Sequence, residues 1–463
     1  MKKEIDYTRF NSPVTPNRSR RLYIETYGCQ MNVSDSEVVA AIMQQAGFTI
    51  TDHMADADVV LINTCSVRDN AEQRVRGRLD LFRLQKQRMP GLIVGVLGCM
   101  AERLKEQLLE NGTVDLVAGP DAYRTLPQLV HNAESGQQGV NTLLSREETY
   151  ADISPVRTDK NGVTAFVSIM RGCNNVCAYC VVPYTRGAER SRPSETILRE
   201  VRTLLQNGYR EVTLLGQNVN SYCEPAAAES KTITFARLLE RVALEDPSLR
   251  VRFSTSHPKD MHNDVLYTIA MYPNICNHIH LPVQSGSSRI LEKMRRGYSR
   301  EHYMERLAKI REIIPECAIT TDIIAGFCSE TDDDHAQTLS LMREAEYDAA
   351  FMFRYSERPG TKAARHYPDD VPTEIKTRRL NEIIALQNQL SLESNRRDVG
   401  KIFIVLAEGN SKRSDAFLFG RTSHNKVTVF PKAKFKAGDY VPVKITTCTS
   451  ATLIGEVTGM NNE

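Results

Sequence analysis

The feature that most constrains the fold is a series of six strand-like runs between residues 163 and 356, separated by segments of helical length. The runs are VTAFVSIM, EVTLLGQN, VRFSTS, HIHLPVQS, AITTDIIAGF and DAAFMFRYS, and two of the intervening segments are 194–207 and 300–314. Six β/α units in series predict a complete or partial parallel barrel. The functional groups of such a barrel lie at the C-terminal ends of its strands.

An earlier part of the chain, residues 21–135, shows a similar alternation. Its near-continuous apolar runs are RLYIETYG, DVVLINT, LIVGVLG and DLVAG, which are typical of parallel strands covered on both faces. After the first run, Ser34 and Glu37 have the spacing of a capping box, and Gly47 suits a helix end. These patterns predict an N-terminal open parallel-sheet α/β domain.

The end of the chain, residues 397–463, has a different character. Its five short β-rich runs, KIFIVLAE, AFLFGRT, NKVTVF, YVPVKITTC and ATLIGEVTG, predict a small all-β barrel of OB or similar type. From residue 401 onward there are nine Lys and Arg against five Asp and Glu. Because small β-barrels commonly hold oligonucleotides, we expect a nucleic-acid contact here, and a solvated basic surface is the alternative.

The predicted domain organisation has five parts. They are a flexible basic tail at 1–20, the α/β domain at 21–135, a polar linker at 136–160, the parallel barrel at 161–396 and the β-barrel at 397–463. The formal net charge of the 463 residues is only +2, so contact with nucleic acid must come from local patches.

Compartment and redox chemistry follow from what the sequence contains. No run approaches the roughly 20 apolar residues of a membrane span, so we expect a cytoplasmic protein without a membrane partner. The eleven cysteines are an odd number and accompany no secretory signal. This count favours metal or redox chemistry over a disulfide framework.

Three cysteines stand together in RGCNNVCAYC, directly after the first predicted barrel strand. A structural zinc site needs four ligands, but Cys173, Cys177 and Cys180 are followed by no Cys or His before Cys223. A [4Fe-4S] cluster held by three thiolates keeps one iron open for a substrate. The motif therefore favours such a cluster at the functional end of the barrel.

Three further cysteines, Cys29, Cys65 and Cys99, each come just after a predicted parallel strand of the N-terminal domain. Carboxyl ends of parallel strands gather along one edge of a sheet, where ligands bind. A second cluster held by three thiolates is the favoured interpretation. Three independent buried cysteines are the alternative, because free cysteine is among the most buried residue types.

The chain resembles a known family over residues 20–460. CNNVCAYC is similar to the signature of radical S-adenosylmethionine (SAM) enzymes, and further blocks resemble methylthiotransferases of the tRNA-modifying MiaB type. These blocks are YGCQMNVSDSE, NTCSVRDNAEQR, RGCNNVCAYCVVPYTRGAERSRP, LLGQNVNSY, STSHP, HLPVQSGS and GRTSHNKVTVF. The resemblance implies an N-terminal methylthiotransferase domain, a partial (β/α)6 TIM-like radical-SAM barrel and a C-terminal TRAM barrel for tRNA.

The resemblance also implies cofactors and partners. Cys173, Cys177 and Cys180 would hold a radical-SAM [4Fe-4S] cluster, and Cys29, Cys65 and Cys99 an auxiliary [4Fe-4S] cluster that carries the sulfur. Two SAM molecules per turnover would serve as methyl donor and radical source. The implied reaction inserts a methylthio group at C2 of isopentenyl-adenosine at position 37 of a tRNA anticodon stem-loop. An electron donor such as flavodoxin or ferredoxin and a sulfur donor would be needed.

The expected SAM or substrate contacts are polar or small residues in the cluster motif and at strand ends. They are Tyr179, Gly216, Gln217, Asn218, Ser254, Ser256, His257, Gln284, Ser285 and Arg192. Arg186, Arg190 and Arg192 suit phosphate or SAM carboxylate groups through bidentate donation. No catalytic residue beyond the clusters is predicted.

One segment departs from the family pattern. A Pro-Gly turn usually follows DIIAGF, but this chain has Cys328-Ser329 there, which leaves the turn and any role of Cys328 open. We interpret Cys328 as a thiol without a functional partner. The same interpretation applies to Cys223, Cys276, Cys317 and Cys448.

Two alternative functions remain open. A related enzyme of the same family would modify threonylcarbamoyl-adenosine in tRNA or an aspartyl side chain of a ribosomal protein. The GCQMN and RGCNN blocks favour the isopentenyl type. A protein of another class would be a non-catalytic iron–sulfur sensor that binds RNA.

Overall fold

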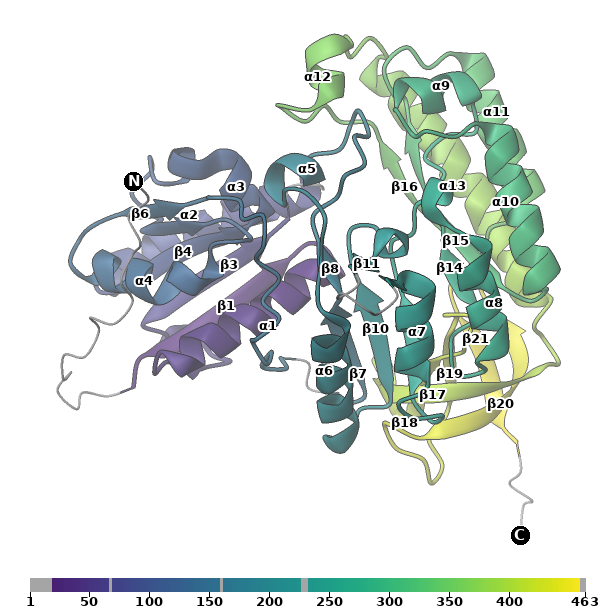
Figure 1. The fold of residues 1–463 in the computed structure, drawn as a ribbon, viewed down its shortest axis with the longest axis horizontal. Helices are drawn as coiled ribbons and strands as arrows, with labels where there is room; N and C mark the ends of the chain where they lie inside the picture. Colours follow the sequence, from purple (N-terminus) through teal and green to yellow (C-terminus); the bar gives the residue numbers. More distant parts are fainter. Residues whose placement is uncertain (1–18, 66–68, 159–160, 226–231, 459–463) are drawn as a thin grey trace.

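The computed structural model describes residues 19–65, 69–158, 161–225 and 232–458 (Figure 1). The predicted flexible tail at 1–20 lies outside these ranges except for its last two residues. Three bodies follow one another along the chain, an α/β domain, a partial parallel barrel and a small β-barrel. The multidomain α/β prediction is confirmed.

The N-terminal domain is an open sheet of six parallel strands in the order β2-β1-β3-β4-β5-β6. The strands are β1 (Arg21–Tyr27), β2 (Thr49–Ile50), β3 (Val59–Thr64), β4 (Ile93–Gly98), β5 (Leu116–Ala118) and β6 (Gly139–Asn141). Helices α1 (Gln30–Gln45) and α4 (Leu126–Glu134) pack on one face, and α2 (Asp69–Arg88) and α3 (Cys99–Leu104) pack on the other. Both faces are covered, which explains the continuous apolar runs.

The start of α1 differs from the predicted capping box. The helix begins at Gln30, with Cys29 as its N-cap residue, and the Asn32 amide donates to the Cys29 carbonyl at 2.9 Å. Ser34 and Glu37 lie buried inside the helix, so the capping-box prediction is wrong. The predicted end is confirmed, because Gly47 follows the helix with a φ of +89°.

The structure also corrects the linker predicted at 136–160. Residues Gly139–Asn141 form β6, which pairs in parallel with β5 and extends the sheet. Tyr150 and Ile153 are buried in the core that α1 and α4 share with the sheet, and the Tyr150 hydroxyl donates to the Pro120 carbonyl at 3.0 Å. The polar sequence misled the prediction because β6 is an edge strand, half-buried along its length.

The second body is a partial barrel of six parallel strands, as predicted. It consists of two three-stranded sheets, β13-β10-β7 and β14-β15-β16, joined where the Ser256 amide donates to the His280 carbonyl. The strands are β7 (Thr164–Ser168), β10 (Glu211–Leu215), β13 (Arg250–Phe253), β14 (His278–His280), β15 (Ala318–Ala325) and β16 (Ala349–Arg354). The helices that cover them are α6 (Ser194–Gln206), α7 (Phe235–Ala243), α8 (Asn263–Met271), α10 (Arg300–Ile313), α11 (Asp332–Ala345) and α13 (Thr373–Arg396).

Shorter elements decorate the ends of the barrel strands. Two small antiparallel pairs are β8 (Met170–Arg171) with β9 (Arg190–Ser191), and β11 (Cys223–Glu224) with β12 (Ile233–Thr234). The short helices are α5 (Val182–Thr185), α9 (Ser288–Lys293) and α12 (Lys362–His366). They lie at the end of the barrel where the strands finish, at the top of Figure 1.

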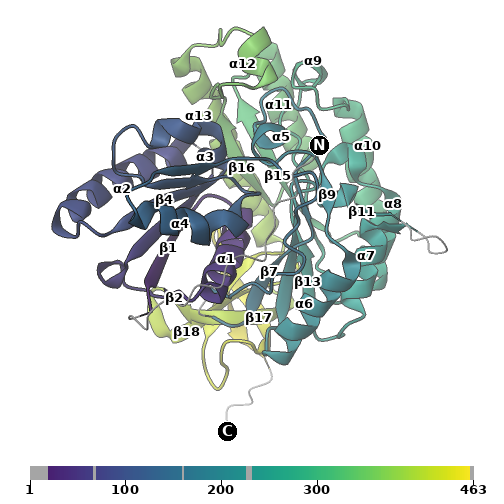
Figure 2. The ribbon, with the colours of Figure 1, turned by 60° about the vertical axis from the view of Figure 1, so that its left-hand side comes forward.

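The third body is a closed five-stranded β-barrel in the order β17-β18-β19-β21-β20, as predicted. Its strands are β17 (Ile402–Ser411), β18 (Ser414–Arg421), β19 (Val427–Pro431), β20 (Tyr440–Cys448) and β21 (Leu453–Val457). It packs under the N-terminal ends of β10 and β13, where Arg252 binds Glu211 at 2.8 Å and the Thr422 carbonyl at 2.7 Å. Figure 2 shows this barrel (yellow) far from α5 and α12.

No helix within the described ranges is both long enough and apolar enough to cross a bilayer.

The close pairing of β17 with β18 predicts different effects of two glycine substitutions. A Cβ at Gly420 would overlap the carbonyl oxygen of Leu406, whereas a Cβ at Gly409 would meet only the ring of Phe419 at 3.4 Å. Gly420→Ala should therefore destabilise the β-barrel by about 1–3 kcal/mol, and Gly409→Ala should have little effect. Thermal denaturation of both variants checks this, and equal melting temperatures would contradict the register.

Candidate functional site

The loop between β8 and β9 carries Cys173, Cys177 and Cys180 at the mouth of the partial barrel. Cys177 is buried, and Cys173 and Cys180 are half-buried. Two backbone hydrogen bonds fix the loop, from the Ala178 amide to the Met294 carbonyl and from the Ala363 amide to the Ala178 carbonyl. Burial raises the pKa of Cys173 to about 11 and that of Cys180 to about 12. With these raised pKa values, the two thiols lose their protons readily only when a bound metal displaces them.

An arginine that sequence reasoning missed lies against this loop. Arg296 is buried, and its Nη1 lies 3.3 Å from Cys177 Sγ and 3.4 Å from the Tyr179 hydroxyl. Its Nη2 donates to the Pro282 carbonyl at 2.9 Å. The adjacent arginines of MRRGYS carry no sequence signal that one of them is buried against a cysteine loop.

The barrel mouth beside the loop contains buried polar atoms that lack a hydrogen-bond partner among the described residues. These atoms are Gln217 Oε1, Asn218 Oδ1, Asn220 Oδ1, Ser256 Oγ and His257 Nε2. A buried polar group without a partner costs free energy, so several at one place indicate that a polar ligand completes them. The amino, carboxylate and ribose groups of SAM fit this demand.

The imidazole of His257 is held neutral. Burial, together with the charges of Arg296 and Lys259, lowers its pKa to about 2. Its Nδ1 accepts from the Lys259 amide at 3.3 Å, which leaves the proton on Nε2. His257 therefore offers a neutral N–H donor to the barrel mouth.

The other predicted contact residues occupy different environments. Gly216 directly follows β10, where a Cβ would overlap Met170, and Gln284 comes after β14 with a φ of +74°. Ser254 is half-buried, and its amide donates to the Leu214 carbonyl. The Ser285 hydroxyl accepts from the Ser287 amide at 3.2 Å, so it supports its own loop.

The three N-terminal cysteines lie at the carboxyl ends of neighbouring strands. Cys29 follows β1, Cys65 follows β3 and Cys99 begins α3 after β4, and these strands are adjacent in the sheet. Gly28 has a φ of +121°, and a Cβ there would overlap Cys65 Cβ. Only glycine at position 28 allows the loops of Cys29 and Cys65 to approach this closely.

The thiols at this edge differ in acidity. A hydrogen bond from Cys65 and the charge of Arg186 lower the pKa of Cys29 to about 6 against the effect of burial. Burial raises the pKa of Cys99, opposed by Arg186. Across the described ranges, no three Cys, His, Asp or Glu side chains meet closely enough to hold a single ion. A cubane spreads its irons over several corners, so its thiolates stand farther apart than the ligands of one ion.

A buried ionic network joins the two cysteine loops. Asp35 of α1 accepts from Arg171 Nη1 at 2.8 Å and from Arg186 Nη2 at 2.7 Å. Asp121 lies 3.5 Å from Arg171 and 2.9 Å from Arg190. Burial alone would raise the pKa of Asp35, but the two guanidinium groups hold it below its ordinary value.

These contacts give the three predicted phosphate or SAM ligands other partners. Arg186 and Arg190 bind the aspartates of the network, and Arg192 binds Glu200. All three guanidinium groups are buried. Sequence reasoning missed this because the partners of Arg186 and Arg190 are more than 60 residues away in the chain.

The turn after β15 packs against the loop that carries Cys173, Cys177 and Cys180. Phe327 and Cys328 pack in one cluster with Ala178. Ser329 occupies the left-handed region with a φ of +63°, the conformation that a Gly would adopt without strain. Cys328 is thus a packing residue beside the loop.

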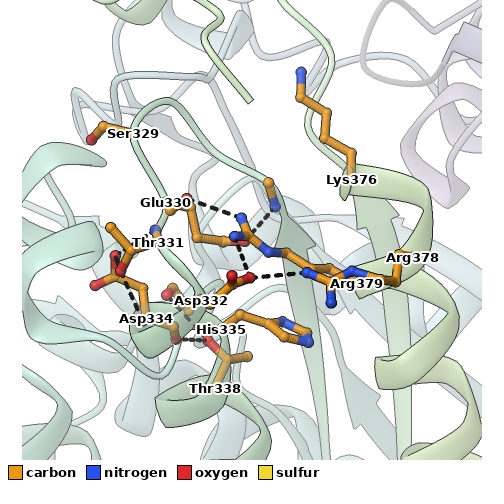
Figure 3. A network of polar contacts seen from close by, with 12 residues as sticks. Ser329, Glu330, Thr331, Asp332, Asp334, His335, Thr338, Lys376, Arg378 and Arg379 are labelled. Atoms are coloured by element: carbon orange, nitrogen blue, oxygen red, sulfur yellow. Dashed lines mark hydrogen bonds and ion pairs between the residues drawn. The ribbon is translucent and has the colours of Figure 1, made fainter. Parts of the chain in front are cut away.

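Figure 3 shows how a carboxylate holds this turn. Glu330 Oε1 accepts from the Gly326 amide at 2.9 Å and from Arg379 Nη1 of α13 at 3.0 Å. Arg379 Nη2 donates to Asp332 at 3.0 Å. The pair of Glu330 and Arg379 is buried, so it fixes the turn to α13.

Comparisons with known proteins decide the family. Family models match residues 21–119 as "Uncharacterized protein family UPF0004", 167–342 as the Radical SAM superfamily and 396–458 as a TRAM domain. The tRNA-2-methylthio-N(6)-dimethylallyladenosine synthase of Phocaeicola vulgatus is 59% identical over 98% of this chain and 99% of its own. The synthase of Chloroherpeton thalassium is 56% identical over 95% and 96%. The chain belongs to this synthase family.

Family membership confirms the predicted radical-SAM enzyme and its cofactors, [4Fe-4S] clusters and SAM. The fold is also found in a radical SAM methyltransferase, TsrM of Kitasatospora setae, with a TM-score of 0.57 and 14% identity. That alignment covers 75% of this chain and 77% of the other.

The environment of Arg379 predicts unequal effects at its two acidic partners. The side chain of Glu330 is 3% exposed and that of Asp332 is 79% exposed. Glu330→Gln should destabilise the chain by about 3 kcal/mol, because it leaves the charge of Arg379 buried with less compensation. Asp332→Asn should cost less than about 1 kcal/mol. Urea denaturation measures both, and equal losses would contradict the burial of this pair.

Proposed function

We propose that this chain adds a methylthio group to carbon 2 of N6-dimethylallyladenosine in tRNA. The observation that carries the proposal is the junction itself, where two sets of three cysteines lie on loops joined by Asp35. Synthases named for this product are 59% and 58% identical over 98% and 96% of this chain, which supports the same reaction. In this proposal Cys173, Cys177 and Cys180 hold the radical-SAM cluster, and Cys29, Cys65 and Cys99 hold the auxiliary cluster.

The chemistry demands radicals because the C2–H bond of adenine is strong and carries no acidic proton. When bound, the radical-SAM cluster supplies the electron that turns SAM into a source of a hydrogen-abstracting carbon radical. The chain's own groups bind and orient. Asn218 and Ser256 offer their unpaired oxygens to SAM, and His257 offers its Nε2–H. Placement then governs the rate, because the reacting atoms must meet at near-attack distances.

The proposed reaction also consumes SAM, electrons and sulfur. Two SAM molecules per turnover account for one methyl transfer and one radical. An electron donor such as flavodoxin or ferredoxin and a separate sulfur donor complete the reaction. The proposed compartment is the cytoplasm.

The path of the tRNA follows from the position of the β-barrel. This barrel packs under the N-terminal ends of the strands, whereas the cysteines lie at their opposite ends. In this proposal a bound tRNA spans the distance along β16, an edge strand of the partial barrel. Phe351 and Phe353 are 54% and 36% exposed there, and Phe351 lies edge-on to His280. Exposed aromatic rings are stacking platforms for unpaired bases.

Single cysteine substitutions separate the two proposed cluster sites. Cys177→Ala should abolish SAM cleavage, and Cys65→Ala should leave cleavage measurable but stop sulfur insertion. Cys223→Ala, at an exposed cysteine that belongs to neither set, is the matched control and should change neither. The readouts are 5′-deoxyadenosine release and mass spectrometry of tRNA nucleosides. If Cys177→Ala and Cys65→Ala both cleave SAM normally, the two-site assignment is wrong.

The aromatic edge predicts weaker tRNA binding when its rings are removed. Phe351→Ala combined with Phe353→Ala should raise the tRNA dissociation constant roughly 10-fold or more. Tyr267→Ala removes an aromatic ring that is 54% exposed on the outer helix α8 and should leave binding unchanged. Filter binding with dimethylallylated tRNA measures both. Equal affinities in the two variants would place the tRNA elsewhere.

A further inference from the structure

We propose that Arg186 is a positioning residue for the auxiliary cluster. It belongs to the loop of the radical-SAM cysteines, yet it places a buried positive charge against the cysteines of the other domain. The inference rests on the proposed function, because it takes Cys29, Cys65 and Cys99 to hold a cluster. Nothing in the sequence pattern of these cysteines requires a cation from the facing domain.

The geometry of Arg186 carries the inference. The residue directly follows α5, and its Nη2 donates to Asp35 at 2.7 Å. Its Nη1 is buried and has no hydrogen-bond partner among the residues that the structure describes. The charge of this group acts on the thiols of both Cys29 and Cys99. Because α5 packs against α3, the helix that Cys99 begins, this unpaired guanidinium nitrogen is available as a donor for sulfur.

The charges of the network agree with this role. Arg171, Arg186 and Arg190 meet two aspartates, Asp35 and Asp121, so the described part of the network has one positive charge in excess. Buried charges without compensation are strongly disfavoured. A cluster held by three thiolates is a net anion, and it would balance this charge.

The position of the charge also has a consequence for electron transfer. A cation beside the sulfur ligands stabilises the reduced cluster and raises its reduction potential. Arg186 can act only when the two domains are packed together, because α5 and α3 belong to different domains and lie against each other. The auxiliary cluster is thereby tuned by the loop that holds the radical-SAM cluster.

The experiment uses the full-length chain with Cys173→Ala, Cys177→Ala and Cys180→Ala, reconstituted without oxygen so that the auxiliary site is measured alone. Into this parent we introduce Arg186→Gln, Arg186→Lys or the matched control Arg171→Gln. Arg171 shares Asp35 but lies over the ring of Tyr150. The readouts are iron content, melting temperature, and the midpoint potential followed by electron paramagnetic resonance.

We expect Arg186→Gln to lower the midpoint potential or to lose the cluster, Arg186→Lys to stay near the parent, and Arg171→Gln to reduce only the melting temperature. Equal potentials and iron contents in Arg186→Gln and the parent would overturn the inference, as would equal cluster loss in Arg186→Gln and Arg171→Gln. A parent that binds no cluster would instead refute the proposed function, and the role of Arg186 would fall with it.

Discussion

The carboxylate of Asp35 is the contact on which the arrangement of this enzyme depends. Asp35 lies in α1, the helix that follows Cys29, and it binds Arg171 and Arg186, which flank Cys173, Cys177 and Cys180 in the sequence. Each cysteine set is fixed within its own domain by strand ends and glycine turns. The buried network helps to fix one set against the other. A buried ion pair contributes little net stability, but losing one partner is costly, which makes such a network a strict determinant of register.

Both domains place their chemistry by the same rule of parallel sheets. Cysteines follow β1, β3 and β4 at one edge of the N-terminal sheet, and polar side chains lie at the mouth of the partial barrel. Because α3 and α5 pack together, these two carboxyl edges face each other. The unpaired oxygens of Asn218 and Ser256 are buried at this mouth and do not face solvent.

Much of this could be predicted from the sequence, because strand runs and cysteine positions are local signals. All six barrel strands and the five strands of the C-terminal barrel lie where their apolar runs predicted. Edge strand β6 was missed because half-buried edge residues carry little apolar pattern. Partners of Arg186 and Arg296 were missed because ion pairs between distant segments leave no periodic trace. The contacts predicted for single SAM-binding side chains stay predictions.

The proposed function requires two separate clusters, each held by three cysteines, at one junction. Iron and sulfide counting on oxygen-free protein tests it most directly. The chain should hold about eight of each, and about four should remain when either cysteine set is replaced by alanine. A chain that holds only one cluster, or that loses all its iron when either set is replaced, would contradict the claim.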